Sequence, residues 1–593
     1  MRRFLVTCLV TGLASALALL PAFAQQAADA VAPEVATALA AKNASEVVRG
    51  EKWMIAAANP LAAKAGADVL ARGGSAADAA IAAQLVLGLV EPQSSGLGGG
   101  AFVVWYDAKS GKVTTLDGRE TAPSGARPTR FLNEDGEPMK FFDAVVGPLS
   151  VGVPGTPRLL MQLHERYGKV DLDGLFDPAL ELAENGFAVS PRLAELTARG
   201  AERLARFPET AAYFLPQGKP IEVGTVLKNP AYAATLRTLA SEWGEDFYGG
   251  GIADSILDTL KQAAEVANTG PVTMTKADLA NYAVVERDAV CVPYRAYEVC
   301  GMGPPSSGGL TVGQILGMAS ATDLAALGPD SAEAWRVIGD ASRLAFADRG
   351  LYMADSDYVP MPTKGLVAPD YLRSRAALMT PGKALSKDAV APGDPAWDHA
   401  SLLVPDEAIE LPSTTHISIV DDQGNALSMT ASIENAFGSR IMVGGFLLNN
   451  ELTDFSFRTH RDGRPITNRV EPGKRPRSSM APTIVLEGGK PRLVVGSPGG
   501  SRIIGYVAKT IIGHLDWSMD VQRAVSYPHL VNRFGTYDLE EGTDAAKLQA
   551  PLEAMGYEVN LRGLNSGLHA IAITPKGLAG GADPRREGIA LGR

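Results

Sequence analysis

The pattern of apolar positions near the N-terminus predicts two helices followed by a buried strand. Residues 60–73 begin with proline and reach the first glycine of a Gly-Gly pair, the usual order for a helix. Ser75 precedes an apolar stretch that runs to residue 90, so we expect it to cap a second helix, buried on most sides. The pattern at residues 101–106 predicts a strand. The glycines at 96 and 98–100 follow a helix and precede a strand, the reverse of a nucleotide-binding loop, which indicates close backbone approach instead.

The periodic pattern is lost in residues 381–413 and returns directly after them. Proline, aspartate, alanine and glycine dominate this segment, which predicts an exposed, mobile strap. Residues 417–420 then alternate as a strand, residues 422–425 form a turn, and residues 426–433 return as a second strand. A flexible strap that runs into a buried hairpin is what a self-cleavage site requires.

The first 24 residues have the pattern of a secretory signal peptide. Arg2 and Arg3 precede an apolar stretch at residues 4–20, and Pro21 is followed by Ala-Phe-Ala at 22–24. The alternative is a membrane anchor, for which the apolar stretch is short. We therefore expect a mature protein that begins at residue 25, is periplasmic or secreted, and keeps no transmembrane anchor.

Two cysteines remain after removal of the signal peptide, Cys291 and Cys300. They flank a segment that predicts two short strands around a turn, and an exported pair favours a disulfide. The alternative is two buried reduced thiols. Two cysteines and seven scattered histidines show no ligand spacing, so the sequence predicts no metal site and no cofactor.

Charge excludes one class of partner. The chain has 55 Lys and Arg residues against 66 Asp and Glu residues, a formal charge of −11, with no basic run. Nucleic acid and anionic membranes are therefore not expected partners. The hydrophobic fraction of 46% is enough for a large buried core.

The boundary between strap and strand carries the candidate nucleophile. Common hydrolase signatures such as Gly-x-Ser-x-Gly are absent from the chain. Cleavage between Ser413 and Thr414 would leave the α-amine of Thr414 as the nearest base for its own hydroxyl, with a pKa close to neutral. Taken alone, Thr-Thr-His at 414–416 is also an ordinary strand start, so the hypothesis depends on the rest of the chain.

Several motifs, in one order along the chain, resemble the γ-glutamyltransferase family. Those after the strap are Thr-Thr-His at 414–416, Val-Asp at 420–421, Gly-Asn at 424–425, Leu-Leu-Asn-Asn-Glu at 447–451, Asp-Phe-Ser at 454–456, Lys-Arg-Pro-Arg-Ser-Ser-Met at 474–480, Gly-Ser-Pro-Gly-Gly at 496–500 and Asp-Pro-Arg at 583–585. Those before it lie at 98–100, 117–120 and 304–309. The resemblance implies an α+β, four-layer αββα N-terminal-nucleophile hydrolase. Residues 25–413 would form a large subunit and residues 414–593 a small subunit of one heterodimer.

The resemblance also implies catalytic roles. Thr414 would be the nucleophile, and Ser432 would orient its hydroxyl, at a position where the family more often has threonine. Gly499 and Gly500 would present backbone N–H groups to an oxyanion. The alternative for this glycine pair is a simple turn.

A second group of residues is implied to bind the substrate. Arg119 would hold the α-carboxylate through its planar guanidinium, assisted by the hydroxyls of Ser478 and Ser479. The acids implied to hold the α-ammonium are Glu434, Glu451 and Asp454. Many family members have asparagine at position 434, so two acids here would attract a cation but also repel each other. The alternatives are a surface salt bridge for Arg119, turn capping for the serines and a solvated acid for Glu434.

The function implied is that of an exported γ-glutamyltransferase or glutathione hydrolase. It would cleave itself before Thr414, form a γ-glutamyl ester on Thr414 from donors such as glutathione, and pass the group to water or to an amino acid or peptide. One alternative is a cephalosporin or glutaryl-amide acylase on the same fold, and another is a catalytically silent binding protein. Residues 456–473, where the family often has a lid, contain Phe457 but no Tyr or Trp, so we place no aromatic gate there.

Overall fold

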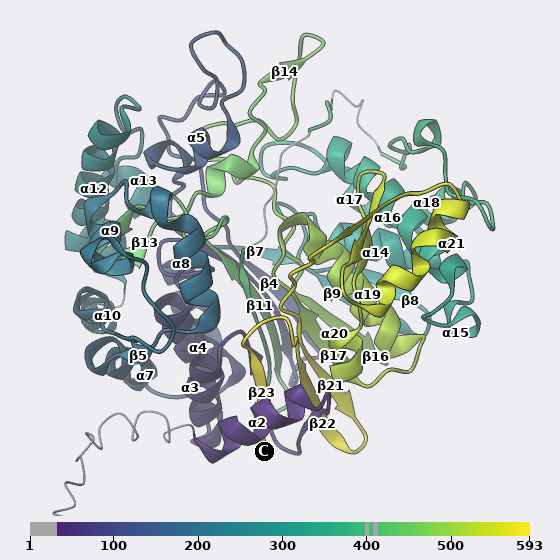
Figure 1. Ribbon diagram of the computed structural model, residues 1–593, viewed down its shortest axis with the longest axis horizontal. Coiled ribbons are helices and arrows are strands. Elements are labelled where there is room, and N and C mark those ends of the chain that lie inside the picture. The colour runs from purple at the N-terminus through teal and green to yellow at the C-terminus, as the bar shows by residue number, and fades with distance from the viewer. Residues whose placement is uncertain (1–31, 243, 398–402, 407–412) are drawn as a thin grey trace, which may run out of the picture.

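Two seven-stranded antiparallel sheets lie face to face at the centre of the computed structural model (Figure 1). The structure describes residues 32–242, 244–397, 403–406 and 413–593. The strands of the first sheet are, in spatial order, β23 (Ile589–Gly592), β2 (Met54–Ala57), β10 (Thr415–Val420), β11 (Ala426–Ser432), β3 (Gly100–Asp107), β4 (Lys112–Gly118) and β7 (Val285–Asp288). Those of the second are β1 (Val48–Gly50), β22 (Gly577–Ala582), β21 (His569–Thr574), β17 (Lys490–Gly496), β16 (Thr483–Glu487), β9 (Tyr297–Gly301) and β8 (Val290–Tyr294).

Helices cover the outer face of each sheet. The first sheet is covered by α3 (Pro60–Ala71), α4 (Ala76–Val90) and α6 (Thr156–Tyr167). Helix α7 (Asp173–Asn185) packs on α4, and α10 (Pro230–Glu242) packs on α7, at the left in Figure 1. The second sheet is covered by α14 (Gly308–Ala319), α19 (Ile503–Leu515) and α20 (Val521–Ser526), and α16 (Ala332–Tyr352) packs on α14, at the right. The four-layer αββα arrangement expected from the sequence is confirmed.

The remaining elements of the described chain are shorter or lie outside these layers. The helices are α2 (Pro33–Asn43), α5 (Phe141–Val145), α8 (Pro191–Leu204), α9 (Pro208–Phe214), α11 (Glu245–Gly249), α12 (Gly251–Ala267), α13 (Lys276–Ala280), α15 (Leu324–Leu327), α17 (Thr363–Leu366), α18 (Pro369–Ala376) and α21 (Gln549–Ala554). The strands are β5 (Phe187–Ala188), β6 (Val226–Leu227), β12 (Met442–Val443), β13 (Phe446–Leu447), β14 (His460–Arg461), β15 (Arg464–Pro465), β18 (Leu530–Asn532), β19 (Thr536–Glu540) and β20 (Glu558–Arg562).

The alternation of side chains in β2 explains why the central strands are buried on both faces. Ile55 belongs to the core formed with α3 and α4, whereas Met54 and Ala56 belong to the core shared with the second sheet. Every residue of β2, β10 and β11 is buried. Successive side chains of a strand point to opposite faces, so a strand in this position has no exposed face.

The local predictions near the N-terminus are confirmed. The helix expected over residues 60–73 is α3, and the next is α4, which Ser75 caps in a reciprocal capping box with Asp78. The strand expected at residues 101–106 lies within β3. The predicted hairpin after the strap is β10–β11, paired in register from Thr415 opposite Ala431 to Val420 opposite Ala426.

The glycine run before β3 lies where two backbones meet. A Cβ atom on Gly98 would lie 2.1 Å from the carbonyl oxygen of Leu447, and one on Gly99 would lie 2.0 Å from that of Ser432. No side chain fits at such distances. These glycines therefore allow the close backbone approach that the sequence indicated.

Cys291 in β8 lies directly opposite Cys300 in β9, and the two form a disulfide. The two strands are the hairpin expected from the sequence. They lie at one edge of the second sheet, away from the strands that carry the candidate nucleophile.

The strap has the expected exposure over only part of its described length. Residues 398–402 and 407–412 of it lie outside the described residues. In the described part, Arg343 of α16 donates to the Leu385 carbonyl at 2.9 Å, and Asp348 of α16 accepts from the Gly393 N–H at 2.8 Å. Five further described residues of the strap are buried: Ala384, Pro395, Val404, Asp406 and Ser413. The structure therefore ties these parts of the strap to the body, because buried polar side chains satisfy its backbone groups.

The predicted signal peptide at residues 1–24 lies outside the described residues. Within the described ranges, every helix is too short or too polar to cross a bilayer.

The strands on either side of the Ser413–Thr414 bond are interleaved. The first sheet takes β2, β3, β4 and β7 from before this bond and β10, β11 and β23 from after it. Strand β10 pairs with β2 on one side and with β11 on the other. The second sheet mixes the two parts of the chain in the same way.

Cutting the bond between Ser413 and Thr414 should therefore leave one folded particle. We expect residues 25–413 and 414–593 to elute together in size-exclusion chromatography and to separate only on a denaturing gel. Both fragments should lose structure in a single transition on addition of denaturant, because neither retains a complete sheet. Elution of two separately folded fragments without denaturant would contradict this expectation.

Candidate active site

Thr414 lies at the N-terminal end of the central strand β10 and is buried. Its Oγ1 atom is 3.2 Å from the Oγ of Ser432, at the end of the neighbouring strand β11. The preceding Ser413 donates from its hydroxyl to the Gln93 carbonyl at 2.9 Å. Thr414 has a φ of 93°, a conformation that is strained for a β-branched residue. The bond before Thr414 is thus held in place on both sides.

Ser432 links Thr414 to Glu434. The Ser432 hydroxyl accepts a 2.8 Å hydrogen bond from the backbone N–H of Glu434. The Glu434 carboxylate accepts from the Asn450 side-chain amide. Glu434 is 5% exposed, so it is a buried acid and not a solvated one.

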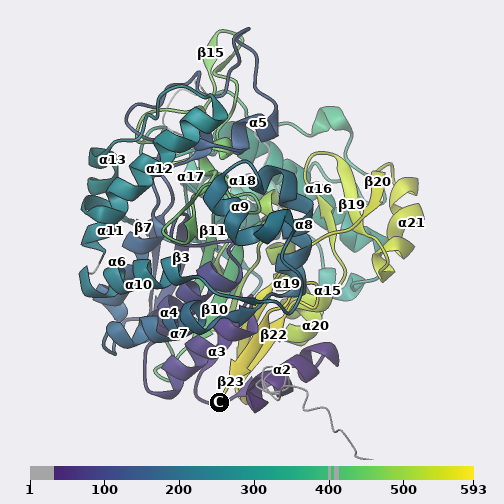
Figure 2. The ribbon, with the colours of Figure 1, turned by 60° about the vertical axis from the view of Figure 1, so that its left-hand side comes forward.

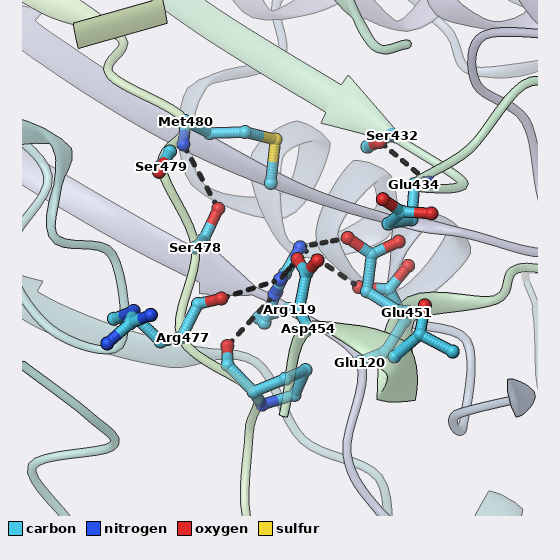
Figure 3. Close-up of polar contacts among 12 residues, drawn as sticks. Arg119, Glu120, Ser432, Glu434, Glu451, Asp454, Arg477, Ser478, Ser479 and Met480 are labelled. Atoms are coloured by element: carbon cyan, nitrogen blue, oxygen red, sulfur yellow. Dashed lines mark hydrogen bonds and ion pairs between the residues drawn. The ribbon is translucent and has the colours of Figure 1, made fainter. Parts of the chain in front are cut away.

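Arg119 follows the last residue of β4 and is 1% exposed. Its guanidinium pairs with Glu451 and lies 2.5 Å from the Oδ2 of Asp454. It also donates to the carbonyls of Pro476 and Arg477, each at 3.2 Å (Figure 3). Burial alone lowers the pKa of Arg119, but the carboxylates of Glu451 and Asp454 outweigh it and raise the pKa, so the guanidinium is charged. In this structure, therefore, Arg119 is paired with two of the acids that the sequence predicted to hold the α-ammonium of the substrate.

Glu120 adds a further carboxyl group beside this pair and is fully buried. Burial, followed by repulsion from Glu451, raises the pKa of Glu120 well above its ordinary value. Burial therefore favours the neutral form of Glu120. Glu434, Glu451 and Asp454 are further acids of the same pocket, so acidic groups outnumber Arg119 there.

Ser478 and Ser479 lie on a loop that two other segments hold. Ser307 donates from its hydroxyl to the Ser478 carbonyl at 2.7 Å, and Arg349 of α16 donates to the Ser479 hydroxyl at 2.7 Å. The Ser478 hydroxyl accepts from the backbone N–H of Met480 at 3.1 Å. The predicted turn at residues 304–309 thus holds the Ser478 backbone, and α16 holds the Ser479 hydroxyl.

Gly499 and Gly500 form the turn between β17 and α19. Their φ angles are 141° and 58°, in the left-handed region that favours glycine. A Cβ on Gly499 would lie 2.8 Å from the ring of Tyr506. Any side chain at Gly499 would therefore displace the turn.

These residues surround one pocket of about 260 Å³. It is lined by Arg119, Thr414, Ser432, Glu434, Glu451, Asp454, Ser478, Ser479, Met480, Gly500 and Ile503. Of the catalytic and substrate-binding residues expected from the sequence, only Gly499 is not a lining residue, and it adjoins Gly500. The candidate nucleophile, further hydroxyl groups, a guanidinium and several acids therefore meet in one place.

One residue that contacts Thr414 was not predicted from the sequence. Arg586, in the loop between β22 and β23, donates to the Thr414 carbonyl at 3.0 Å and is buried. Burial, followed by the charge of Arg192, lowers the pKa of Arg586 to about 9. The motif at 583–585 ends one residue before Arg586 and was the available signal. Glu120 was likewise within the motif at 117–120 but received no role.

Phe457, the only aromatic residue of the predicted lid segment, faces a different cluster. Its ring centroid lies 4.7 Å from that of Phe131 and 6.3 Å from that of Phe141. The hairpin β14–β15 that follows it projects at the top of the molecule in both views (Figures 1 and 2). The lining residues of the pocket, within the described part of the chain, include no aromatic side chain.

Comparison with known proteins places the chain in a family. A sequence profile described as Gamma-glutamyltranspeptidase matches residues 62–593. The chain is 37% identical over 558 residues to the glutathione hydrolase proenzyme of Bacillus subtilis (strain 168), with 92% of each chain covered. It is 34% identical over 541 residues to the acylase ACY 1 proenzyme of Pseudomonas sp. (strain SE83), covering 90% of this chain and 92% of the relative.

A solved structure gives the same result for the fold. The cephalosporin acylase from Bacillus halodurans superposes with a TM-score of 0.80 at 25% identity, covering 92% of this chain and 97% of the other. The family resemblance inferred from the motifs is confirmed over nearly the whole chain. This protein is an enzyme of the gamma-glutamyltranspeptidase family.

Proposed function

We propose that the chain is an exported precursor that cleaves itself before Thr414 and then transfers γ-glutamyl groups from donors such as glutathione to water, an amino acid or a peptide. The observation that carries this proposal is the ion-pair network of Arg119, Glu451 and Asp454 beside the Thr414 hydroxyl. Its charges are those that a γ-glutamyl group, with one carboxylate and one ammonium, complements.

Self-cleavage uses the Thr414 hydroxyl. The Ser432 hydroxyl, 3.2 Å away, orients Oγ1, which adds to the carbonyl carbon of Ser413. The C–N bond breaks, so the acyl group passes to Oγ1 as an ester and the nitrogen becomes the α-amine of Thr414. Water hydrolyses this ester and leaves a carboxylate on Ser413. The strained φ of Thr414 favours departure from the starting state.

Turnover repeats this chemistry on a substrate amide. The Thr414 α-amine takes the hydroxyl proton while Oγ1 attacks the γ-carbonyl of the donor, and the proton then passes to the leaving amine. Backbone N–H groups at Gly499 and Gly500 stabilise the oxyanion, which glycine permits by close approach. Water or an amine acceptor then takes the γ-glutamyl group from the ester. No step needs a metal or cofactor.

When a zwitterionic donor binds, its two charges replace the ion pairs that the protein's own side chains make with one another, and no charge is left unpaired. Its α-carboxylate takes the Arg119 guanidinium and the hydroxyls of the 478–479 loop, while its α-ammonium takes Glu451 and Asp454. A buried charge that loses its partner costs roughly 3–5 kcal/mol, so this exchange is much better than removal of one ion alone. The excess of acids around Arg119 also favours an added cation.

The acylase reading is the second candidate, because the chain is similar to acylases in sequence and in fold. A glutaryl group has the carboxylate but lacks the ammonium. On binding Arg119 it would leave Glu451 and Asp454, together with Glu434, beside a neutral carbon. The charge of this pocket therefore supports γ-glutamyl over glutaryl donors. A catalytically silent binding protein is opposed by the family and by the intact residues around Thr414.

The proposal includes export and two subunits. The pattern at residues 1–24 supports a periplasmic or secreted protein without a remaining anchor. After cleavage, residues 25–413 and 414–593 form the large and small subunits of one heterodimer. The interleaved strands support this association.

Thr414→Ala should remain a single chain on a denaturing gel, because alanine has no hydroxyl to attack the Ser413 carbonyl. Ser432→Ala should still cleave, but more slowly, since it removes only the contact that orients Oγ1. Both variants should unfold at temperatures close to wild type. Cleavage of Thr414→Ala at the same bond would rule out Thr414 as the processing nucleophile.

Arg119→Lys should raise KM for a chromogenic γ-glutamyl anilide by about tenfold or more, because lysine keeps the charge but loses the planar fork, and tenfold corresponds to about 1.4 kcal/mol. Self-cleavage should continue, since Arg119 does not contact the scissile bond. KM is measured on fully cleaved protein, with wild type as the control. An unchanged KM would remove Arg119 from donor binding.

Glu434→Asn tests donor class. Asparagine is one methylene shorter than glutamate, but it keeps an oxygen that can accept a hydrogen bond and lacks the charge that favours an ammonium. We expect wild type to prefer γ-glutamyl over glutaryl anilide in kcat/KM, and the variant to narrow that preference by about tenfold, the scale of one charge contact. A higher kcat/KM of wild type for the glutaryl anilide would instead establish the acylase function. An unmoved ratio would leave Glu451 and Asp454 as the ammonium ligands.

A further inference from the structure

A buried ion pair joins the strap to the loop that carries Ser478 and Ser479. The Oδ2 atom of Asp406 lies 2.9 Å from the Nη2 atom of Arg477, and both side chains are almost fully buried. Figure 3 shows the Arg477 side chain on the opposite side of this loop from Arg119. Neither Asp406 nor Arg477 lines the pocket, so binding of the donor does not explain the pair.

Asn468 connects this ion pair to the pocket. Its side-chain amide donates to Asp406 Oδ2 and to the Asp454 carbonyl, each at 2.8 Å. Its Oδ1 accepts from the Arg477 backbone N–H at 3.1 Å. The Arg477 carbonyl in turn accepts from Arg119. The network therefore fixes the strap to the same backbone that forms the pocket wall.

A second attachment lies two residues earlier in the strap. The Val404 N–H donates to the Thr467 hydroxyl at 3.0 Å, and the Thr467 N–H donates to the Val404 carbonyl at 3.2 Å. The Asp406 N–H donates to the Gly350 carbonyl at 3.0 Å. Residues 404–406 are thus held by segments that lie both before and after the cleavage bond.

We propose that Asp406 and Arg477 are positioning residues for self-cleavage, and that their ion pair anchors the strap seven positions before Ser413. The inference rests on the self-cleavage in the proposed function. An anchored strap has fewer conformations than a free one, so the Ser413 carbonyl spends more time within reach of the Thr414 hydroxyl. The second fixed point is the Ser413 hydroxyl on the Gln93 carbonyl. Arg477 is needed because a buried Asp406 requires a cation.

The test measures the cleavage rate of the full chain without its signal peptide. Wild type, Asp406→Asn, Arg477→Met and the double variant are made by cell-free synthesis, and loss of the uncut chain is followed on denaturing gels. We expect each single variant to cleave about tenfold more slowly or worse, as for a misplaced reacting group. The double variant removes both charges of this pair together with the anchor, so it should remain slow. A double variant that cleaves at the wild-type rate would overturn the proposal.

Asp516→Asn is the matched control. Asp516 is also a buried acid, 2.9 Å from Arg295, but it lies outside the strap and the pocket. Unfolding temperatures are compared in a Thr414→Ala background, where every chain is uncut. Asp516→Asn should cleave like wild type even where it unfolds at a lower temperature. Equal slowing of Asp516→Asn and Asp406→Asn would overturn the proposal, since it would report lost stability alone.

Measuring KM on the cleaved enzyme distinguishes a role in positioning the strap from a role in donor binding. Once cleaved, Asp406→Asn should have a KM for γ-glutamyl anilide close to wild type. A raised KM with an unchanged cleavage rate would overturn the proposal and assign the pair to the pocket. Failure of the wild-type chain to cleave would overturn the proposed function as well, whereas cleaving wild type with unaffected variants would overturn this inference alone.

Discussion

The pairing of β10 between β2 and β11 is the constraint on which the candidate site depends. Its hydrogen bonds run through the centre of a sheet that is covered on both faces, so the start of the strand cannot shift without disturbing both neighbours. Thr414 is the residue directly before that start, and Ser432 ends the adjacent strand. The distance between their hydroxyls is therefore set by sheet register and not by a loop.

The charges of the pocket are arranged around this fixed point. Arg119, at the end of β4, pairs with Glu451 and Asp454, and the buried Glu120 lies beside them. These ion pairs satisfy the buried charges of the free protein. Under the proposed function the same groups would supply the opposite charges that a zwitterionic donor needs, so one network would serve both the stability of the free protein and the selection of its substrate.

The sequence predicted the elements of this site better than the contacts among them. Hairpin β10–β11 and helix α4 follow from periodicity and capping, which depend on near neighbours, and the pocket residues came from motifs in a family order. Which charges pair with Arg119 depends on segments more than three hundred positions apart, and no local pattern encodes that. The composition of the strap predicted exposure. Composition describes only the segment itself and cannot show that Arg343, Asp348 and Arg477, from other parts of the chain, bind it. Arg586 was missed for the same reason.

The contact of Arg586 with the Thr414 carbonyl has a consequence for the timing of maturation. Arg586 lies 172 positions after Thr414 in the chain, and β23 after it pairs with β2. A chain that is still being synthesised therefore lacks both the contact and this strand until those residues have emerged from the ribosome. Under the proposed function, cleavage that depends on this contact would wait for that point. Chains terminated before Arg586 would then yield no small subunit, although they contain the Ser413–Thr414 bond itself.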